Sequence, residues 1–158
     1  EEIFVQISPL AKGQGVNYAP ASVLAARLSL PFSMALAAKN RKVELNDFTE
    51  DLLTDKDHLE FMKKVKVEPE PEFNIKYPDS GFTGKVTVTT KDGKKYSEMV
   101  IYPKAHPERF ATDEEFKEKY DSLARITWDD KKAEKVYDLF MNLENNNIGD
   151  IIPLLASC

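Results

Sequence analysis

The chain has 158 residues, of which 42% are hydrophobic and 31% charged, with 22 basic against 27 acidic side chains. This composition is that of one ordinary globular domain or two small ones, and it excludes an intrinsically disordered chain. A net charge of −5 and a pI near 5.2 provide no broad positive field, so neither nucleic acid nor a membrane is expected as a partner.

The first forty residues contain only five charged side chains. Residues 1–7 alternate, with Ile3, Val5 and Ile7 on one side, which predicts a strand rather than a signal peptide. We therefore expect the chain to begin within a fold. A segment so poor in charge is expected to be buried in this chain or against a partner.

The most apolar stretch, residues 18–38, does not predict a membrane helix, because Arg27 and Pro31 interrupt it. Ser29 and Pro31 instead indicate the start of a soluble helix, since proline is tolerated in a first helical turn. This helix is expected to run to about Ala38.

Residues 46–77 predict a series of short elements. We expect helices over residues 46–53 and 55–64, then a strand at residues 65–68. An acidic turn broken by two prolines follows, and then a short strand at residues 73–77. The inward positions of the two helices are Phe48, Leu52, Leu59 and Met62.

The clearest local signal is a hairpin around Asp92-Gly93. This dipeptide stands between two alternating runs and supplies the positive φ angles of a type I′ turn. A two-residue loop pairs Val86 with Met99 and places both on one face with Val88 and Ile101. That face is expected to meet the helices, which makes the first two thirds of the chain a two-layer α+β unit.

From Thr112 onward the pattern is helical. Thr112 and Glu115 form a capping box, and Thr127 with Asp130 is expected to start a second helix. The inward positions follow at helical spacing: Phe116, Tyr120, Leu123, Ala133, Val136, Tyr137, Phe140 and Leu143.

The last helix is expected to start at Asp150 or Ile151, so that Pro153 lies in its first turn. These final helices need a larger apolar partner surface than the chain itself supplies. The single cysteine, Cys158, excludes an intrachain disulfide and a cysteine-rich zinc site, and it favours a reducing, cytoplasmic location.

Few side chains offer catalytic chemistry. His58 lies in a charged run and is expected on the solvent side of its helix, whereas the loop residue His106 is either an acid or base or an ordinary loop residue. Arg27 is a lone cation in a charge-poor segment, so when buried it needs a partner, either a ligand carboxylate, a glutamate or a helix end. No phosphate loop, nucleophile elbow or metal-binding cluster is present in the sequence.

The order and spacing of several segments resemble the MmgE/PrpD family, which includes 2-methylcitrate dehydratase and cis-aconitate decarboxylase. The resemblance covers almost the whole chain. The segments that carry it are Asn17-Tyr18-Ala19-Pro20, Ala26-Arg27-Leu28-Ser29-Leu30-Pro31-Phe32, Lys64-Val65-Lys66-Val67, the hairpin at residues 86–93, the loop at residues 103–107, and Phe116-Lys117-Glu118-Lys119-Tyr120.

The resemblance implies an α+β fold in two parts. Residues 1–108 would form a two-layer lid-type domain, with short helices on a small, mainly antiparallel sheet. Residues 109–158 would form C-terminal helices that pack on a helical domain absent from this chain. The sequence departs from the family pattern at Ala105, where glycine is usual, and at Phe110, where proline is usual.

The resemblance also implies a function. Family members remove a proton next to a carboxylate of a small di- or tricarboxylate, and dehydration, decarboxylation or epimerisation follows. They use histidine and lysine rather than a metal or cofactor, and these residues are expected outside this chain, which would be inactive alone. Arg27 and Ser29 match the family's basic-x-Ser pattern before the apolar helix, and with Asn17, in the loop before it, they are the candidates for lining the substrate cleft between the domains. A different hypothesis is a binding or assembly module, acting as a homodimer or completing a separately encoded helical half.

Overall fold

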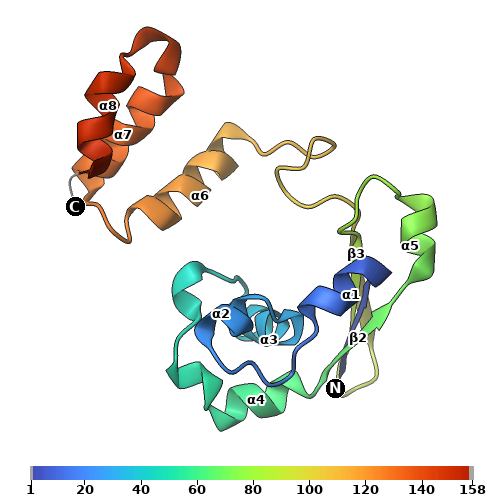
Figure 1. Cartoon of the computed structure of the whole chain (residues 1–158). Helices are drawn as coiled ribbons and strands as arrows, with labels where there is room; N and C mark the ends of the chain where they lie inside the picture. Colours follow the sequence, from blue (N-terminus) through green and yellow to red (C-terminus); the bar gives the residue numbers. More distant parts are fainter. Residues whose placement is uncertain (1, 157–158) are drawn as a thin grey trace. The chain divides into compact units, whose positions relative to one another are not determined.

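The computed structural model describes residues 2–156, and the chain divides into two compact units. Unit 1 is Glu1–Arg109 and unit 2 is Phe110–Cys158. Unit 1 combines helices with a four-stranded sheet, and the described part of unit 2 is helical. The α+β class with a C-terminal helical segment, predicted from the sequence, is confirmed (Figure 1).

The sheet of unit 1 has the strand order β2-β1-β3-β4. The central strand β1 (Glu2–Ile7) is parallel to β2 (Val65–Pro69) and antiparallel to β3 (Gly84–Thr89), which pairs in turn with β4 (Lys95–Val100) in antiparallel fashion. The sheet is therefore mixed, with one parallel pair.

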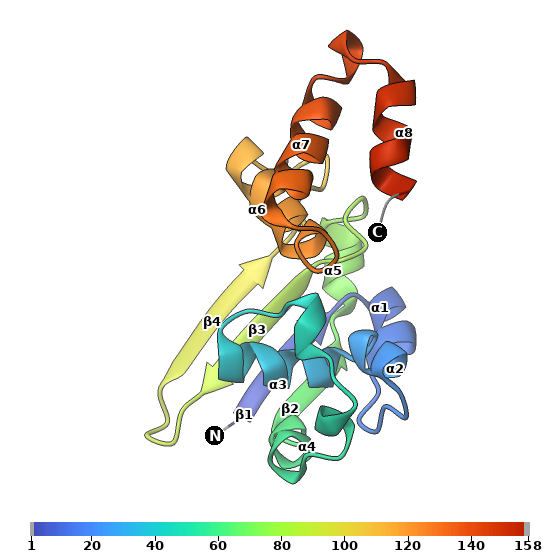
Figure 2. The ribbon, with the colours of Figure 1, turned by 90° about the vertical axis from the view of Figure 1, so that its left-hand side faces the viewer.

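One face of this sheet carries the first core of unit 1. Ile3, Val5 and Ile7 alternate with half-buried residues along β1, as the sequence predicted, and they meet Val65 and Val67 of β2. Helices α1 (Pro9–Gly15), α3 (Leu30–Asn40) and α4 (Lys56–Met62) lie over this face (Figures 1 and 2). They and the following residues contribute Ala11, Val16, Leu30, Met34 and Phe61 to the core.

Helix α3 carries the second core. Ser29 caps its N-terminus and Pro31 lies in its first turn, which confirms the predicted helix start. Arg41 ends it in the left-handed region with φ of 63°. The core consists of Ala26, Phe32, Ala35, Leu36 and Met62. None of the described helices is long and apolar enough to cross a bilayer.

Two predicted elements of residues 46–77 are wrong. The single helix over residues 46–53 is two 3-10 turns, η1 (Leu45–Asp47) and η2 (Asp51–Leu53), because a Glu44–Asp47 capping box closes the first turn and Phe48 is extended. The strand at residues 73–77 is a helix, α5 (Pro71–Lys76). Its cap is Glu70, and proline in the first turn favours a helix over a strand.

The predicted hairpin exists, but its register is wrong by one residue. Gly93 has φ of 81°, whereas Asp92 is not in the positive-φ region, so the turn is not type I′. The amide of Thr90 donates to the carbonyl of Lys94, which leaves a three-residue loop. Val86 therefore pairs with Glu98 instead of Met99.

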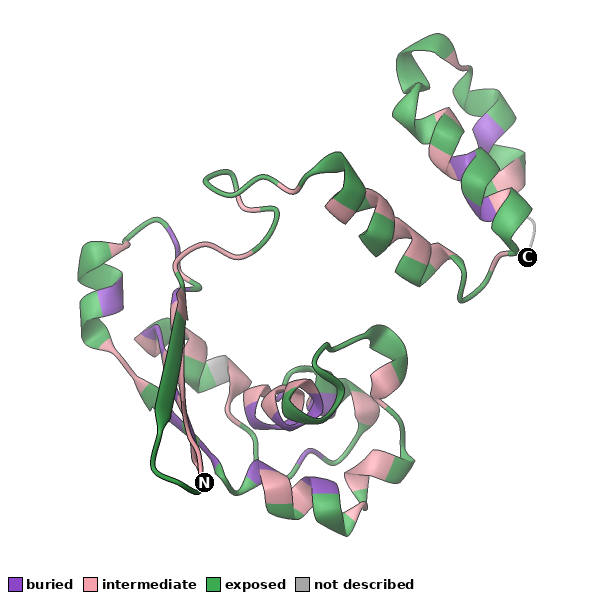
Figure 3. Cartoon of the chain, turned by 180° about the vertical axis from the view of Figure 1, so that it is seen from behind, coloured by how far each residue is buried: buried purple, intermediate pink, exposed green. Residues whose placement is uncertain are grey.

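A shift of one residue exchanges the two faces of a strand. Met99 consequently lies on the face opposite Val86 and Val88, which is the opposite of the predicted arrangement. The residues of β4 that share the core-side face with β3 are Tyr96, Glu98 and Val100, and all three are exposed. The helices of unit 1 thus do not cover the sheet as far as β4 (Figure 3).

Unit 2 is built from α6 (Asp113–Ala124), α7 (Asp130–Met141), η3 (Leu143–Asn145) and α8 (Ile148–Ala156). The Thr112–Glu115 capping box is present as predicted. The cap of α7 is Asp129 rather than Thr127, because the amide of Thr127 still belongs to the end of α6 and donates to Ala124.

The predicted start of the last helix is also wrong. Helix α8 begins at Ile148, two or three residues before the predicted start, and holds Pro153 in its interior. The side chain of Asn147 accepts from the amide of Gly149, and Ile151 is fully buried. Local capping and burial of Ile151 therefore outweigh the lost hydrogen bond of the proline.

The core of unit 2 is small. Ala133, Val136 and Ile151 are buried, but Phe116 is 54% exposed and Phe140 is 43% exposed. Helix α6 has no buried residue. Further apolar side chains on the surface of unit 2 are Leu123, Ile126, Met141, Leu143, Ile148, Ile152 and Leu155. The described part of unit 2 thus leaves much of its apolar surface uncovered.

Charged side chains join α6 to α7. The Lys117 ammonium lies 2.9 Å from both Asp121 and Glu134 and 4.7 Å from the ring centroid of Tyr137. Arg125, at the C-terminal end of α6, pairs with Asp121 of α6 and with Asp130 at the start of α7. These ion pairs therefore link α6 to α7 in addition to the apolar contact between the two helices.

Candidate functional site

Ser29 ties together the segment that leads into α3. Its hydroxyl donates to the carbonyl oxygen of Asn17 at 2.5 Å and accepts from the amide of Phe32 at 3.2 Å. Only 1% of Ser29 is exposed. Since both hydrogen-bonding functions of the hydroxyl are used within the protein, Ser29 holds the loop at Asn17 against the start of α3.

Asn17 and Tyr18 anchor this loop further. The Asn17 side-chain oxygen accepts from the amide of Ala19 at 2.9 Å, which leaves its amide group as a donor on an exposed residue. The Tyr18 hydroxyl donates to the carbonyl of Val65 at 2.8 Å, at the start of β2. The loop is therefore fixed both to α3 and to the sheet.

Arg27 is the last residue of α2 (Val23–Arg27), whose cap is Ser22. Its side chain is exposed and makes no ion pair with any residue in 2–156. Leu24 is 67% exposed and Leu28 is 64% exposed; Leu24 lies about one helical turn before Arg27, and Leu28 follows Arg27 directly in the sequence. We call Leu24, Arg27 and Leu28 the α2 surface.

The three residues selected from the sequence thus lie on one short segment. Asn17 and Ser29 are in direct contact, and Arg27 precedes Ser29 by two residues. The charge-poor segment was expected to be buried in the chain or against a partner. Leu24 and Leu28 of this segment are exposed, so they are not buried within the described part of the chain, and burial against a partner is the alternative that remains for them.

His58 is buried, so its predicted solvent exposure is wrong. It lies four residues before Met62 and therefore on the same inward face of α4, where 4% of it is exposed. Its ring centroid is 4.2 Å from that of Phe32, and its Nε2 atom has no hydrogen-bond partner within the described residues. Burial lowers the pKa of His58 and is the largest effect. The charge of Asp55 raises this pKa, and the charge of Lys39 lowers it further.

His106 lies in an ordered loop after β4. Its Nδ1 atom accepts from the amide of Glu108 at 3.1 Å, and its ring stacks on Tyr102 at 4.7 Å between centroids. Arg109 donates to the carbonyl of Tyr102 at 3.2 Å. Ala105 adopts φ of 67°, in the left-handed region that favours glycine. The loop thus keeps a glycine-type backbone at the position where the resemblance expects glycine.

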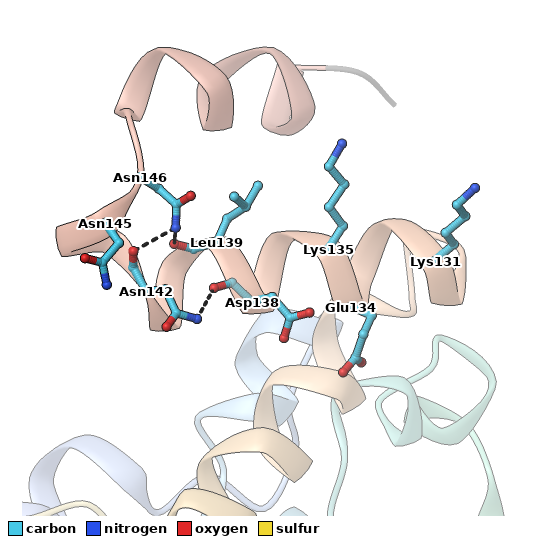
Figure 4. Close-up of a pocket in the computed structure, with 8 residues that line it drawn as sticks. All are labelled: Lys131, Glu134, Lys135, Asp138, Leu139, Asn142, Asn145 and Asn146. Carbon is cyan, nitrogen blue, oxygen red and sulfur yellow. Dashed lines mark hydrogen bonds between the residues drawn. The ribbon is translucent and has the colours of Figure 1, made fainter.

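An open hollow on α7 and η3 was not anticipated from the sequence (Figure 4). The Asn146 amide donates to the carbonyl of Asn142 at 2.7 Å, and the Asn142 amide donates to the carbonyl of Asp138 at 2.8 Å. These asparagines close the end of α7, and the lysines beside them extend away from the helix (Figure 4). Across residues 2–156, no three histidine, cysteine or acidic side chains gather as a metal would require.

The comparison with protein families gives a match over residues 1–145 to the model described as the MmgE/PrpD C-terminal domain. No curated protein matches the chain. The family match covers most of the sequence, all of unit 1 and most of unit 2, and it confirms the resemblance read from the residues.

Proposed function

Since the chain belongs to the MmgE/PrpD family, we propose that it forms the lid and C-terminal helices of a lyase or isomerase acting on a small di- or tricarboxylate. The reaction is proton removal from the carbon next to a carboxylate, followed by dehydration, decarboxylation or epimerisation. The partner of the chain is a helical domain that supplies the acid and base groups.

The observation that supports this proposal best is the unpaired Arg27. Its side chain is exposed on the α2 surface, as are those of Leu24 and Leu28, and it makes no ion pair within the described residues. A guanidinium offers two parallel N–H donors, which match the two oxygens of a carboxylate. Once a partner domain covers Leu24 and Leu28, Arg27 would be desolvated, and its attraction to a carboxylate would increase.

Asn17 and Ser29 have different roles in this proposal. The exposed side-chain amide of Asn17 donates to a second carboxylate oxygen, because its oxygen is already bound to Ala19. Ser29 is buried and doubly hydrogen-bonded, so it positions Asn17 rather than contacting the substrate itself.

The negative charge that develops during the proposed reaction gives Arg27 a function beyond substrate binding. Removal of the proton next to a carboxylate leaves a carbanion whose electron pair moves into the carboxylate, so negative charge increases on its oxygens. A fixed cation beside those oxygens stabilises this charge as it develops. The base that takes the proton is proposed to lie on the helical domain, since His58 is buried against Phe32.

Reconstitution tests the proposal. The chain is assayed alone and together with a helical domain of the family, with cis-aconitate and 2-methylcitrate as substrates. We expect turnover only in the combined sample, and loss of that turnover on Arg27→Gln. The opposite result is turnover by the chain alone that survives replacement of His58 and His106. It would contradict the proposal that the helical domain supplies the acid and base groups.

The exposed apolar side chains of unit 2 favour one alternative, a non-catalytic assembly module that pairs with a second copy. Sedimentation over a range of concentrations separates the two functions. A module predicts self-association that a helical domain does not reverse. The lid proposal predicts that the helical domain displaces any self-association.

A further inference from the structure

His58 connects α4 to α3 through a contact that the proposed reaction does not use. Its ring packs on Phe32 with centroids 4.2 Å apart and an interplanar angle of 56°. The cap of its own helix, Asp55, accepts from the His58 backbone amide at 2.6 Å. The Nε2 atom is buried without a hydrogen-bond partner in residues 2–156. A neutral imidazole tolerates this position better than an imidazolium, whose charge would remain unsolvated.

Phe32 also belongs to the segment that holds Asn17. Its backbone amide donates to Ser29, and the same Ser29 hydroxyl donates to Asn17. On the side of the 44–54 segment, the Phe32 ring stacks on Phe48 with centroids 5.8 Å apart. A continuous series of contacts therefore runs from His58 through Phe32 and Ser29 to the Asn17 loop.

The charges around His58 come from three elements. Asp55 caps α4 and favours the protonated ring, whereas Lys39 on α3 disfavours it. The intervening segment carries Glu44, Asp47, Glu50 and Asp51, of which only Asp47 is half-buried and the others are exposed. Burial outweighs the effect of Asp55, so the pKa of His58 lies below its ordinary value.

We propose that the contact between His58 and Phe32 is a proton-operated latch on the Asn17 loop. With the ring neutral, α4 holds Phe32, and α3 keeps Ser29 and Asn17 in place. Protonation of the ring separates α4 from α3 and loosens the loop. The latch belongs to unit 1 whatever ligand the chain binds, so it does not depend on the proposed function.

The direction of the pH effect follows from linkage. An unfolded or locally opened His58 binds a proton near its ordinary pKa of about 6.5, while the closed form binds it only at lower pH. The open form therefore gains population as the pH falls from about 7 through about 6.5, and the gain ends below the pKa of the closed form. Each unit of pKa difference allows up to about a tenfold increase in opening.

Amide hydrogen exchange of the full chain at about pH 7.5 and about pH 5.5, corrected for the intrinsic rate, tests the latch. We expect the amides of Phe32 and of α4 to open up to about tenfold more at the lower pH. The amides of β1 and of α6 serve as internal controls and should open much less. His58→Leu should abolish the pH response, and His106→Gln, which alters the other histidine, should retain it.

Two results would overturn the latch. One is a pH response of Phe32 that is the same in His58→Leu as in the unchanged chain. The other is equal opening of β1 and α4, which would indicate global unfolding instead of a local event. If His58→Leu does not fold, the NMR titration of the His58 ring C–H signal decides the matter, because the latch requires His58 to titrate below the ordinary histidine pKa of about 6.5.

Discussion

The Ser29 hydroxyl oxygen lies 2.5 Å from the carbonyl oxygen of Asn17 and at the same time caps α3 through the amide of Phe32. One buried atom therefore fixes both the start of the helix and the position of the loop before it. Asn17 is twelve residues away along the chain, so this bond closes the α2 segment into a compact loop.

Ser29→Ala removes both bonds and leaves the Asn17 carbonyl without its partner. We expect a loss of about 2 kcal/mol in the free energy of unfolding, measured by denaturant titration. Ser22→Ala, which removes the cap of the short and exposed α2, is the matched control and should cost less than about 1 kcal/mol. Equal losses in the two variants would mean that the bond to Asn17 contributes nothing.

Arg27→Gln should leave the stability of the chain within about 0.5 kcal/mol of its original value, because the side chain is exposed and unpaired within the described residues. In the complex with a helical domain, citrate binding measured by calorimetry should weaken by about 1.5–3 kcal/mol. Arg27→Lys keeps the charge but not the two parallel donors. The affinity of this variant for citrate should lie between those of the unchanged chain and Arg27→Gln. Unchanged citrate binding in Arg27→Gln would show that Arg27 does not contact the carboxylate in the cleft.

Ala105→Gly should stabilise unit 1. A left-handed conformation costs a residue with a Cβ about 1–2 kcal/mol, and the added freedom of glycine in the unfolded chain offsets about 0.4–1 kcal/mol of that gain. The expected net change is about 0.5–1 kcal/mol in favour of the variant, measured by thermal unfolding. Ala38→Gly, in the regular helix α3, should instead destabilise by about 0.5–1 kcal/mol.

Lys117→Met should lower the melting temperature of unit 2, because it leaves Asp121 and Glu134 without their shared cation. The fluorescence of Trp128, which lies between α6 and α7, reports on this unit. Lys119→Met changes a lysine of the same helix that makes no ion pair in this network within residues 2–156, and it should have little effect.

The pH dependence of this ion pair has a defined sign. The Lys117 ammonium lowers the pKa of Asp121, so its stabilisation is complete above the ordinary aspartate range near 4. The contribution is lost as the pH falls through the lower pKa of the folded state. The melting temperatures of Lys117→Met and the unchanged chain should therefore converge in acid, and a constant difference down to low pH would contradict the assignment.

The regular elements could be predicted because their patterns are local. The alternation of Ile3, Val5 and Ile7 indicated β1, and the Thr112–Glu115 capping box marked the start of α6. Charge singled out Arg27 as a lone cation in a charge-poor segment, and Ser29 marked a helix start, but the expectation that these two residues and Asn17 line a substrate cleft came only from the family resemblance. That Ser29 is buried and bonded to Asn17 depends on the path of the loop, which the pattern does not contain.

The errors arose where two local signals compete or where tertiary packing decides. Asp92-Gly93 suits a two-residue turn, but only Gly93 adopts positive φ, and the extra loop residue moved Met99 to the opposite face. His58 follows three charged residues, Asp55-Lys56-Asp57, yet its spacing of four from Met62 places it inward. The i,i+4 relation to Met62 was the available signal, and the charged neighbours obscured it.

The position of β1 in the sheet has a consequence for biosynthesis. Ile3 pairs with Val65 on one side and with Val88 on the other, so the central strand leaves the ribosome long before either neighbour exists. Closing such long loops is slow compared with forming the local helices. During translation, the apolar side chains of β1 are exposed in an unpaired nascent segment until β2 has emerged, and a chaperone that recognises short apolar stretches has access to them in that interval.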